Sequence, residues 1–142
     1  MNWVTTLRYA VAKATADESG GLITWRQPPG VYLPTELGIY NTVLPESPNE
    51  AIALGLYPVT EGVETTMGVQ FRYRAATDAR LDEIEDRLSN SWTQREAGTL
   101  EPIELIMCQW SSGASLGQDS GGRLTRSANF YLTANRPLRY RT

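Results

Sequence analysis

The sequence of 142 residues contains no histidine and a single cysteine, Cys108. The absence of histidine removes the usual general base, the commonest metal ligand and every Ser-His or Cys-His catalytic pair. One cysteine cannot form an intrachain disulfide, and because Cys108 lies within an apolar stretch, we expect it to be a buried structural thiol. These absences argue against an enzyme and leave only carboxylate-based catalytic or metal sites to consider.

Long hydrophobic runs and lysine are also scarce. No stretch approaches the roughly 20 apolar residues of a membrane helix, and the N-terminus lacks the pattern of a signal peptide, so we expect a cytoplasmically made protein without membrane contact. All but one of the 13 basic residues are arginine, which fits a protein with large interfaces, although the codon usage of a GC-rich genome explains the bias equally well. The formal net charge of −3 argues against tight binding of nucleic acid through its phosphates.

A strand followed at once by a helix organises the rest of the chain. Apolar and polar residues alternate over 67–75, which is the period of a strand with one buried face. Residues 77 and 78 then offer an N-cap, and apolar residues recur at helical spacing from Leu81 to Trp92. Because the connection is very short, we expect the helix to fold back over the apolar face of the sheet.

The other periodic segments complete one sheet and add a second helix. This helix is capped by Asn2 and ends between Asp17 and Gly21. We expect 38–44 and 50–57 to pair as a hairpin. The strand 102–110 is apolar on both faces, so we expect it to be buried on both sides or covered by a neighbour before a break at 111–115. Further strands are expected at 22–25 and 127–134, the latter after a turn at 119–122. The sequence therefore predicts a single α+β domain over residues 1–142, with one mainly antiparallel or mixed β-sheet packed on one face by two helices.

Candidate sites for chemistry are few. The glycine pairs at 20–21 and 121–122 do not have the spacing of a phosphate-binding loop. Carboxylates crowd the helix after the central strand, but arginines are interleaved with them, so a solvated face with intrahelical pairs such as Glu83 with Arg87 is favoured over a cation site. We therefore predict no catalytic residue, no cofactor and no metal ion.

Three segments are candidates for contacts with partners. The loop 27–34 is rich in proline and carries Val31, Tyr32 and Leu33, apolar residues that a partner surface would explain. Arg72 and Arg74 lie with Gln70 on the polar face of the central strand, together with the polar residues of 127–133, and this face meets solvent, a lumen or another subunit. The third segment is the basic and aromatic tail, with Arg136, Arg139, Tyr140 and Arg141.

The order of elements and several stretches resemble the tail terminator, or tail completion, proteins of long-tailed bacteriophages. The resemblance covers most of the chain from about Gly38 onward. It is carried by the strand ending at 43–45, the apolar strand 51–58, the arginine-bearing strand 70–74, the acidic helix 78–89, and the closing pieces 116–123 and 126–132.

This resemblance implies a structural virion protein without catalytic residues. Its copies form a ring, commonly a hexamer, that caps the head-proximal end of the tail tube, ends tube polymerisation and joins the tail to the neck. The implied partners are further copies of the chain, the tail tube protein and a head–tail connector protein, while genome DNA passes through the lumen without sequence-specific binding. By analogy with tail tube subunits, the polar sheet face looks toward this lumen. Arg72 and Arg74 conflict with a channel that does not hold DNA, so pairing with carboxylates of an adjacent subunit is the alternative for them.

Other functions remain open from the sequence alone. One is a neighbouring head–tail connector or stopper ring subunit. A soluble enzyme with a carboxylate site, such as Asp78 with Glu101 or Glu104, is another. The last is a small cytoplasmic binding module with a defined pocket and no ring.

Overall fold

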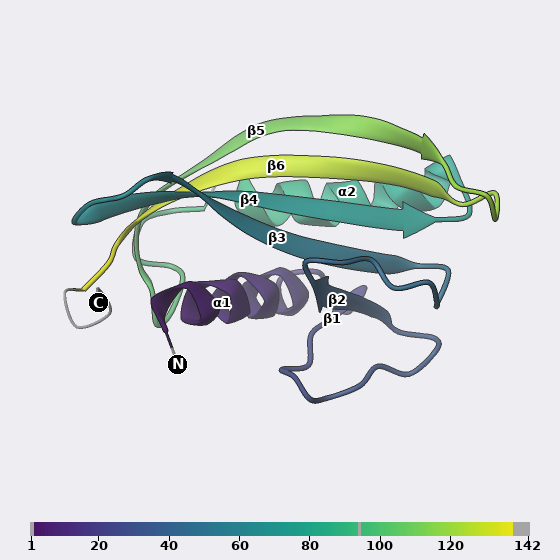
Figure 1. Cartoon of the computed structure of the whole chain (residues 1–142), viewed down its shortest axis with the longest axis horizontal. Coiled ribbons are helices and arrows are strands. Elements are labelled where there is room, and N and C mark those ends of the chain that lie inside the picture. The colour runs from purple at the N-terminus through teal and green to yellow at the C-terminus, as the bar shows by residue number, and fades with distance from the viewer. Residues whose placement is uncertain (1, 94, 138–142) are drawn as a thin grey trace.

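The computed structural model describes residues 2–93 and 95–137. It contains two helices and six strands (Figure 1). The helices are α1 (Trp3–Asp17) and α2 (Asp78–Trp92), and the strands are β1 (Ile23–Thr24), β2 (Leu37–Asn41), β3 (Ala51–Thr60), β4 (Glu64–Ala75), β5 (Glu104–Gln118) and β6 (Leu124–Asn135).

Both predicted helices form, and both begin at the predicted caps. Asn2 Oδ1 accepts a hydrogen bond from the backbone N–H of Thr5 at 2.9 Å, and Thr77 Oγ1 accepts one from Arg80 at 3.2 Å. Each cap satisfies a backbone donor that has no partner within the helix. None of the helices in the described part of the chain is long and apolar enough to cross a membrane.

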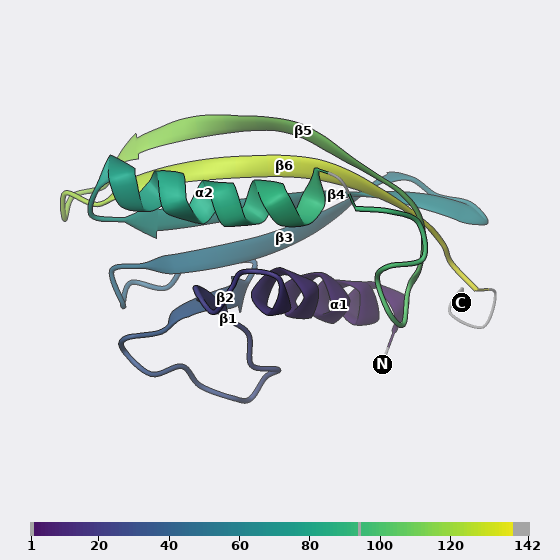
Figure 2. The same cartoon turned by 180° about the vertical axis from the view of Figure 1, so that it is seen from behind.

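The strands form one mixed sheet in the order β1-β2-β3-β4-β6-β5. Both helices lie against the same face of this sheet, and the opposite face carries no helix (Figures 1 and 2). Val69 lies opposite Phe130 in the register of β4 and β6, and both are fully buried beneath the helices. Trp92 of α2 stacks on Phe130 with ring centroids 4.7 Å apart. The predicted α+β fold with helices on one face is confirmed.

The predicted hairpin between 38–44 and 50–57 is wrong, because β2 and β3 are parallel. Ile39 lies opposite Ile52, so the connection, residues 42–50, must carry the chain back to the start of β2 before β3 begins. Parallel pairs usually need a longer crossover, and here a short one suffices because β2 spans only five residues. The long antiparallel partner of β3 is β4 instead.

The prediction for 102–110 is also wrong in part. β5 lies at the edge of the sheet with β6 on one side, and it continues through the predicted break at 111–115. Its register slips at three places, the first between Leu105 and Met107, so an extra residue interrupts the alternation of inward and outward side chains. Leu105 is therefore buried whereas Met107 is exposed, and the apolar run reflects a bulge rather than burial on both faces.

Candidate functional site

The carboxylates of α2 surround an arginine from β6. Arg126 donates to Asp82 Oδ1 at 2.6 Å, to Asp78 Oδ1 at 3.1 Å and to Glu85 Oε2 at 3.3 Å. These bonds, above all the one to Asp82, raise the pKa of the Arg126 guanidinium. Within residues 2–93 and 95–137, no group of carboxylates or Cys108 is placed to hold a metal ion.

One sequence-based interpretation of this helix needs correction. Glu83 pairs with Arg80 at 3.1 Å, whereas Arg87 donates to the backbone oxygen of Ser19 at 3.0 Å. The predicted Glu83–Arg87 pair is therefore replaced by a different pair within α2 and by a contact from Arg87 to the segment that follows α1.

The alternative carboxylate site of an enzyme does not form. Asp78 starts α2 just after Ala75, which pairs with Leu124 at the first residue of β6. Glu104 pairs with Asn135 at the last residue of β6. The two carboxylates are therefore separated by the full length of a 12-residue strand.

Cys108 is half-buried rather than fully buried. Its Sγ donates to the backbone oxygen of Trp92 at 3.2 Å. Burial raises the pKa of this thiol to about 11, so it remains protonated at neutral pH and has the low reactivity of a structural cysteine.

Arg72 and Arg74 both lie on the face of the sheet that the helices leave open, as predicted. There they bind the connection between β2 and β3, residues 42–50, rather than solvent. Arg72 donates to the backbone oxygen of Thr42, and Arg74 donates to those of Asn49 at 3.0 Å and Pro48 at 2.6 Å. Arg74 is only 5% exposed, and this burial lowers the pKa of its guanidinium.

A third arginine holds the same connection. Arg123, which precedes β6, donates to the backbone oxygen of Glu46 at 2.6 Å and to Asp119 Oδ2 at 2.8 Å. Three guanidinium groups thus fix residues 42–50 across one end of the open face through main-chain oxygens. The structure thereby accounts for Arg72 and Arg74 within a single chain, and their contact with another subunit stays a prediction.

The middle of the open face is polar and uncharged. Gln70 lies opposite Asn129 in the register of β4 and β6, and Gly68 lies opposite Tyr131. Thr66 Oγ1 and Thr133 Oγ1 are 2.9 Å apart. We call this band, formed by Thr66, Gly68, Gln70, Asn129, Tyr131 and Thr133, the neutral band.

Beyond the neutral band, the open face becomes acidic. Glu64 and Glu104 lie opposite Asn135 from either side, so the three residues form one row across β4, β6 and β5. Glu61 follows β3 in the turn before β4 and is exposed. Charge on the open face is thus negative at this end, and the arginines at the other end are engaged by the connection 42–50.

The proline-rich loop, residues 27–34, projects beyond the β1 side of the sheet (Figure 1). Val31 is 81% exposed and Leu33 is 61% exposed, as expected for contact residues without a partner. Tyr32 instead turns inward, because its ring covers Gly38 and its hydroxyl donates to the backbone oxygen of Ile39 at 2.6 Å. No side chain larger than hydrogen fits at position 38 under this ring.

A pocket of about 550 Å³ lies between this loop and the connection 42–50. Tyr32 and Tyr40 meet edge to face in its wall, with ring centroids 5.1 Å apart. Arg26, which is also in the wall, is held by a two-pronged ion pair with Glu36, and this pair raises the pKa of the guanidinium and lowers that of the carboxyl. We call this cavity the loop pocket.

A second exposed apolar patch was not predicted from the sequence. Tyr57, Val59 and Val63 are exposed where β3 and β4 join, and this hairpin extends beyond the helices at one end of the molecule, whereas the loop 27–34 lies at the β1 edge (Figure 1). The signal was present in the sequence, since Val59 and Val63 follow Pro58 in a segment expected to be a loop.

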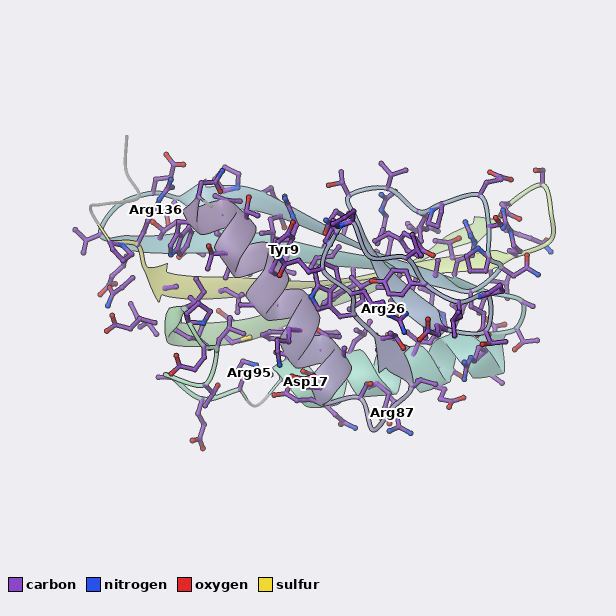
Figure 3. The ribbon with its side chains drawn as sticks, turned by 90° about the horizontal axis from the view of Figure 1, so that it is seen from below. Tyr9, Asp17, Arg26, Arg87, Arg95 and Arg136 are labelled. Atoms are coloured by element: carbon purple, nitrogen blue, oxygen red, sulfur yellow. The ribbon has the colours of Figure 1, made fainter. Side chains whose placement is uncertain are left out.

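Of the predicted tail contacts, only Arg136 lies among the described residues. Its guanidinium carbon lies 5.4 Å from the ring centroid of Trp3, so it packs against the start of α1 (Figure 3). Arg139, Tyr140 and Arg141 lie outside the described residues.

Comparison with solved structures finds the same fold in a chain described as "Virion of native gene transfer agent (GTA) particle". The two structures superpose with a TM-score of 0.59 over 94% of this chain and 97% of that chain, at 10% sequence identity. Comparisons with models of protein families and with curated protein sequences gave no match. The chain therefore has, over nearly its whole length, the fold of a chain from a gene transfer agent virion.

Proposed function

We propose that this chain is a structural subunit of a phage-like tail. Its copies form a closed ring that ends the tail tube at its head-proximal end and joins it to the neck. The fold supports this proposal, because the likeness to a chain of a gene transfer agent particle extends over nearly all of both chains. A subunit of this kind needs no catalytic group, and the described residues offer none that is assembled for chemistry.

The observation that carries the proposal is the open face of the sheet. A polar face without a helix over it meets water, a lumen or a partner. Double-stranded DNA is held mainly by lysine and arginine near its phosphates. The neutral band and the acidic row of Glu64 and Glu104 offer no such cation. Of the two arginines on this face, Arg74 is buried against Pro48 and Asn49, and Arg72, which is more exposed, donates to Thr42. This face suits the wall of a channel through which DNA slides.

Two exposed apolar patches supply the contacts of a ring. One comprises Val31 and Leu33 on the loop 27–34, and the other comprises Val59 and Val63 on the β3–β4 hairpin. The patches differ and lie at separate places, one at the β1 edge and one at the tip of the β3–β4 hairpin, so contact between them is head-to-tail, and head-to-tail contacts generate a ring when the rotation closes. A symmetric dimer requires one patch to meet its own copy and leaves the other exposed.

The test is the native mass of the purified protein, measured alone and with tail tube protein from the same particle. We expect a ring-sized species, or tubes that carry one closed cap and stop elongating. Binding to filled heads without any effect on tube growth indicates a neighbouring connector ring instead. A monomer that leaves tube growth unchanged and binds neither tubes nor heads contradicts the proposal.

A further inference from the structure

The connection 42–50 covers positive charge that has no carboxylate in contact with it. Arg72 and Arg74 lie on the open face, and neither makes an ion pair with any described residue. Their partners are backbone oxygens, which carry no net charge. Arg123, at the same end of the face, has two carboxylates of its own at 2.8 Å and 3.6 Å. The charges of Arg72 and Arg74 are therefore the ones available to an anionic ligand.

The backbone oxygens stand where the oxygens of a phosphate could stand. Arg74 donates through Nε to Asn49 at 3.0 Å and through Nη2 to Pro48 at 2.6 Å. A guanidinium binds two oxygens of a phosphate in the same two-pronged manner. A phosphate carries a full negative charge, so it attracts a guanidinium more strongly than a neutral carbonyl does. The connection has the opposite advantage, because it belongs to the same chain and is always close by.

The connection 42–50 lies on the surface and follows a strained path. None of its residues is buried. Thr42 has a φ of 72°, and it is the one residue other than glycine with positive φ in the described chain. A β-branched residue is unfavourable in this region and stays there only where other contacts hold it. Arg72 supplies such a contact, because it donates to the backbone oxygen of Thr42.

The two ends of the connection are also attached without these arginines. The backbone N–H of Thr42 donates to the backbone oxygen of Leu54 at 2.9 Å. At the other end, Glu50 accepts hydrogen bonds from Arg80 at 2.9 and 3.0 Å. The middle of the connection, residues 43–49, can therefore leave the arginines while β2 stays beside β3.

We propose that Arg72 and Arg74 form a binding site for the phosphates of double-stranded DNA, and that the connection 42–50 occupies this site and keeps it closed. DNA as the ligand rests on the proposed function, because the open face is the proposed wall of the channel. With the connection in place, the donors of both arginines are occupied and DNA slides. With the connection displaced, the two guanidinium groups meet phosphates and hold the DNA.

A substitution that removes positive charge and yet tightens DNA binding tests this site. Arg123 holds the connection through the backbone oxygen of Glu46 but is not part of the site. The purified full chain is titrated into a short labelled DNA duplex at low salt, and fluorescence anisotropy reports binding. We expect Arg123→Met to bind at least about fivefold more tightly than the wild type, because the closed state is weakened.

Arg87→Met is the matched control for this experiment. Arg87 also donates to a backbone oxygen, that of Ser19, but it lies on α2 and does not contact the connection 42–50. The control removes the same charge and should bind DNA no more tightly than the wild type. If Arg123→Met gains no more affinity than Arg87→Met, the proposal is overturned.

Two further variants attribute the gain to the site and to the connection. Adding Arg72→Met to Arg123→Met should return the affinity to the wild-type level or below, because half of the site is removed. Thr42→Gly relaxes the strained φ and favours the closed connection, so it should weaken DNA binding. If Arg123→Met does not fold, Thr42→Gly in the wild-type chain decides the question, and an unchanged affinity at low salt overturns the proposal. Absence of measurable binding by every variant does the same.

These measurements separate the site from the proposed ring. They need only the purified chain and a duplex, so they decide the site even if no ring forms and the proposed function fails. Rings that form and pass DNA, together with no gain by Arg123→Met, overturn the site alone. If Arg123→Met instead gains self-association, measured as native mass, Arg72 and Arg74 belong to a contact with carboxylates of a neighbouring subunit, and the DNA site is overturned.

Discussion

Arg74 Nη2 donates to the backbone oxygen of Pro48 at 2.6 Å, which ties the centre of the sheet to a loop 26 residues earlier in the chain. The same guanidinium donates from Nε to Asn49. The connection 42–50 is the segment that allows β2 to run parallel to β3. By holding this connection, Arg74 stabilises the order and direction of the strands as well as the loop itself.

The first prediction concerns this arginine. Arg74→Met removes two charge-assisted hydrogen bonds from a buried site, and we expect it to lower the free energy of unfolding by about 2–3 kcal/mol. Arg72→Met is the matched control, since Arg72 lies on the same strand and face, is more exposed and makes one such bond, so about 1 kcal/mol is expected. Urea denaturation measures both. Equal losses of unfolding free energy in the two variants contradict the larger structural role of Arg74.

The second prediction concerns pH. Asp119 accepts hydrogen bonds from the backbone of Arg123, from the side chain of Arg123 and from the backbone of Gly121, and these lower the pKa of its carboxyl below the 3.8 of a free aspartate. A lowered native pKa means that the ionised carboxylate stabilises the fold above pH 3.8 and that this contribution is lost as the pH falls through the native pKa.

The test compares the wild type with Asp119→Asn, which keeps one acceptor oxygen and removes the charge. We expect the wild type to be more stable at pH 7 and the difference to shrink as the pH falls below 3.8, followed by urea unfolding at several pH values. Asp86→Asn, which removes the same charge from the exposed side of α2, is the control for the change in net charge. If the stability difference between the wild type and Asp119→Asn is as large at the lowest pH as at pH 7, the ionised carboxylate of Asp119 is not its cause.

The third prediction concerns Cys108. Because burial raises the pKa of its thiol from 9.0 to about 11, the thiolate fraction at pH 8 is about a hundredfold smaller than for a free thiol. We expect alkylation by iodoacetamide to be slower by about this factor in the folded protein than in urea. Mass spectrometry follows the reaction, and similar rates in the two conditions contradict the structural role.

The fourth prediction concerns the proposed channel. Gln70→Lys adds one free cation per subunit to the neutral band, so the assembled ring should retain double-stranded DNA at low salt and release it as salt rises. Asn90→Lys, at an exposed position of α2 on the helical side, adds the same charge outside the channel and serves as the control. Retention by both variants alike, or by neither, shows that the open face does not line the path of DNA.

Local patterns were sufficient for much of the fold. The caps at Asn2 and Thr77, the apolar stripe of α2 and the alternation along β4 are properties of neighbouring residues, and each is present as predicted. The resemblance to tail terminator proteins likewise anticipated a fold found in a virion.

The failures have a common physical cause, which is contact between residues far apart in sequence. The connection that precedes the parallel strand β3 is held by guanidinium groups from β4, and the carboxylates of α2 are bridged by Arg126, which lies 44 residues after Asp82. The spacing of apolar and polar residues along the sequence does not reveal such contacts. The bulge between Leu105 and Met107 is equally hidden, because an inserted residue imitates a strand that is apolar on both faces.

The connection 42–50 is held through the oxygen atoms of its peptide groups, which every amino acid possesses. Arg72 and Arg74 therefore place no demand on the side chains of Thr42 or Asn49. Substitutions at such positions can reshape one wall of the loop pocket while the hydrogen bonds from Arg72 and Arg74 keep the path of the backbone the same, so the shape of this surface is separable from the topology of the sheet.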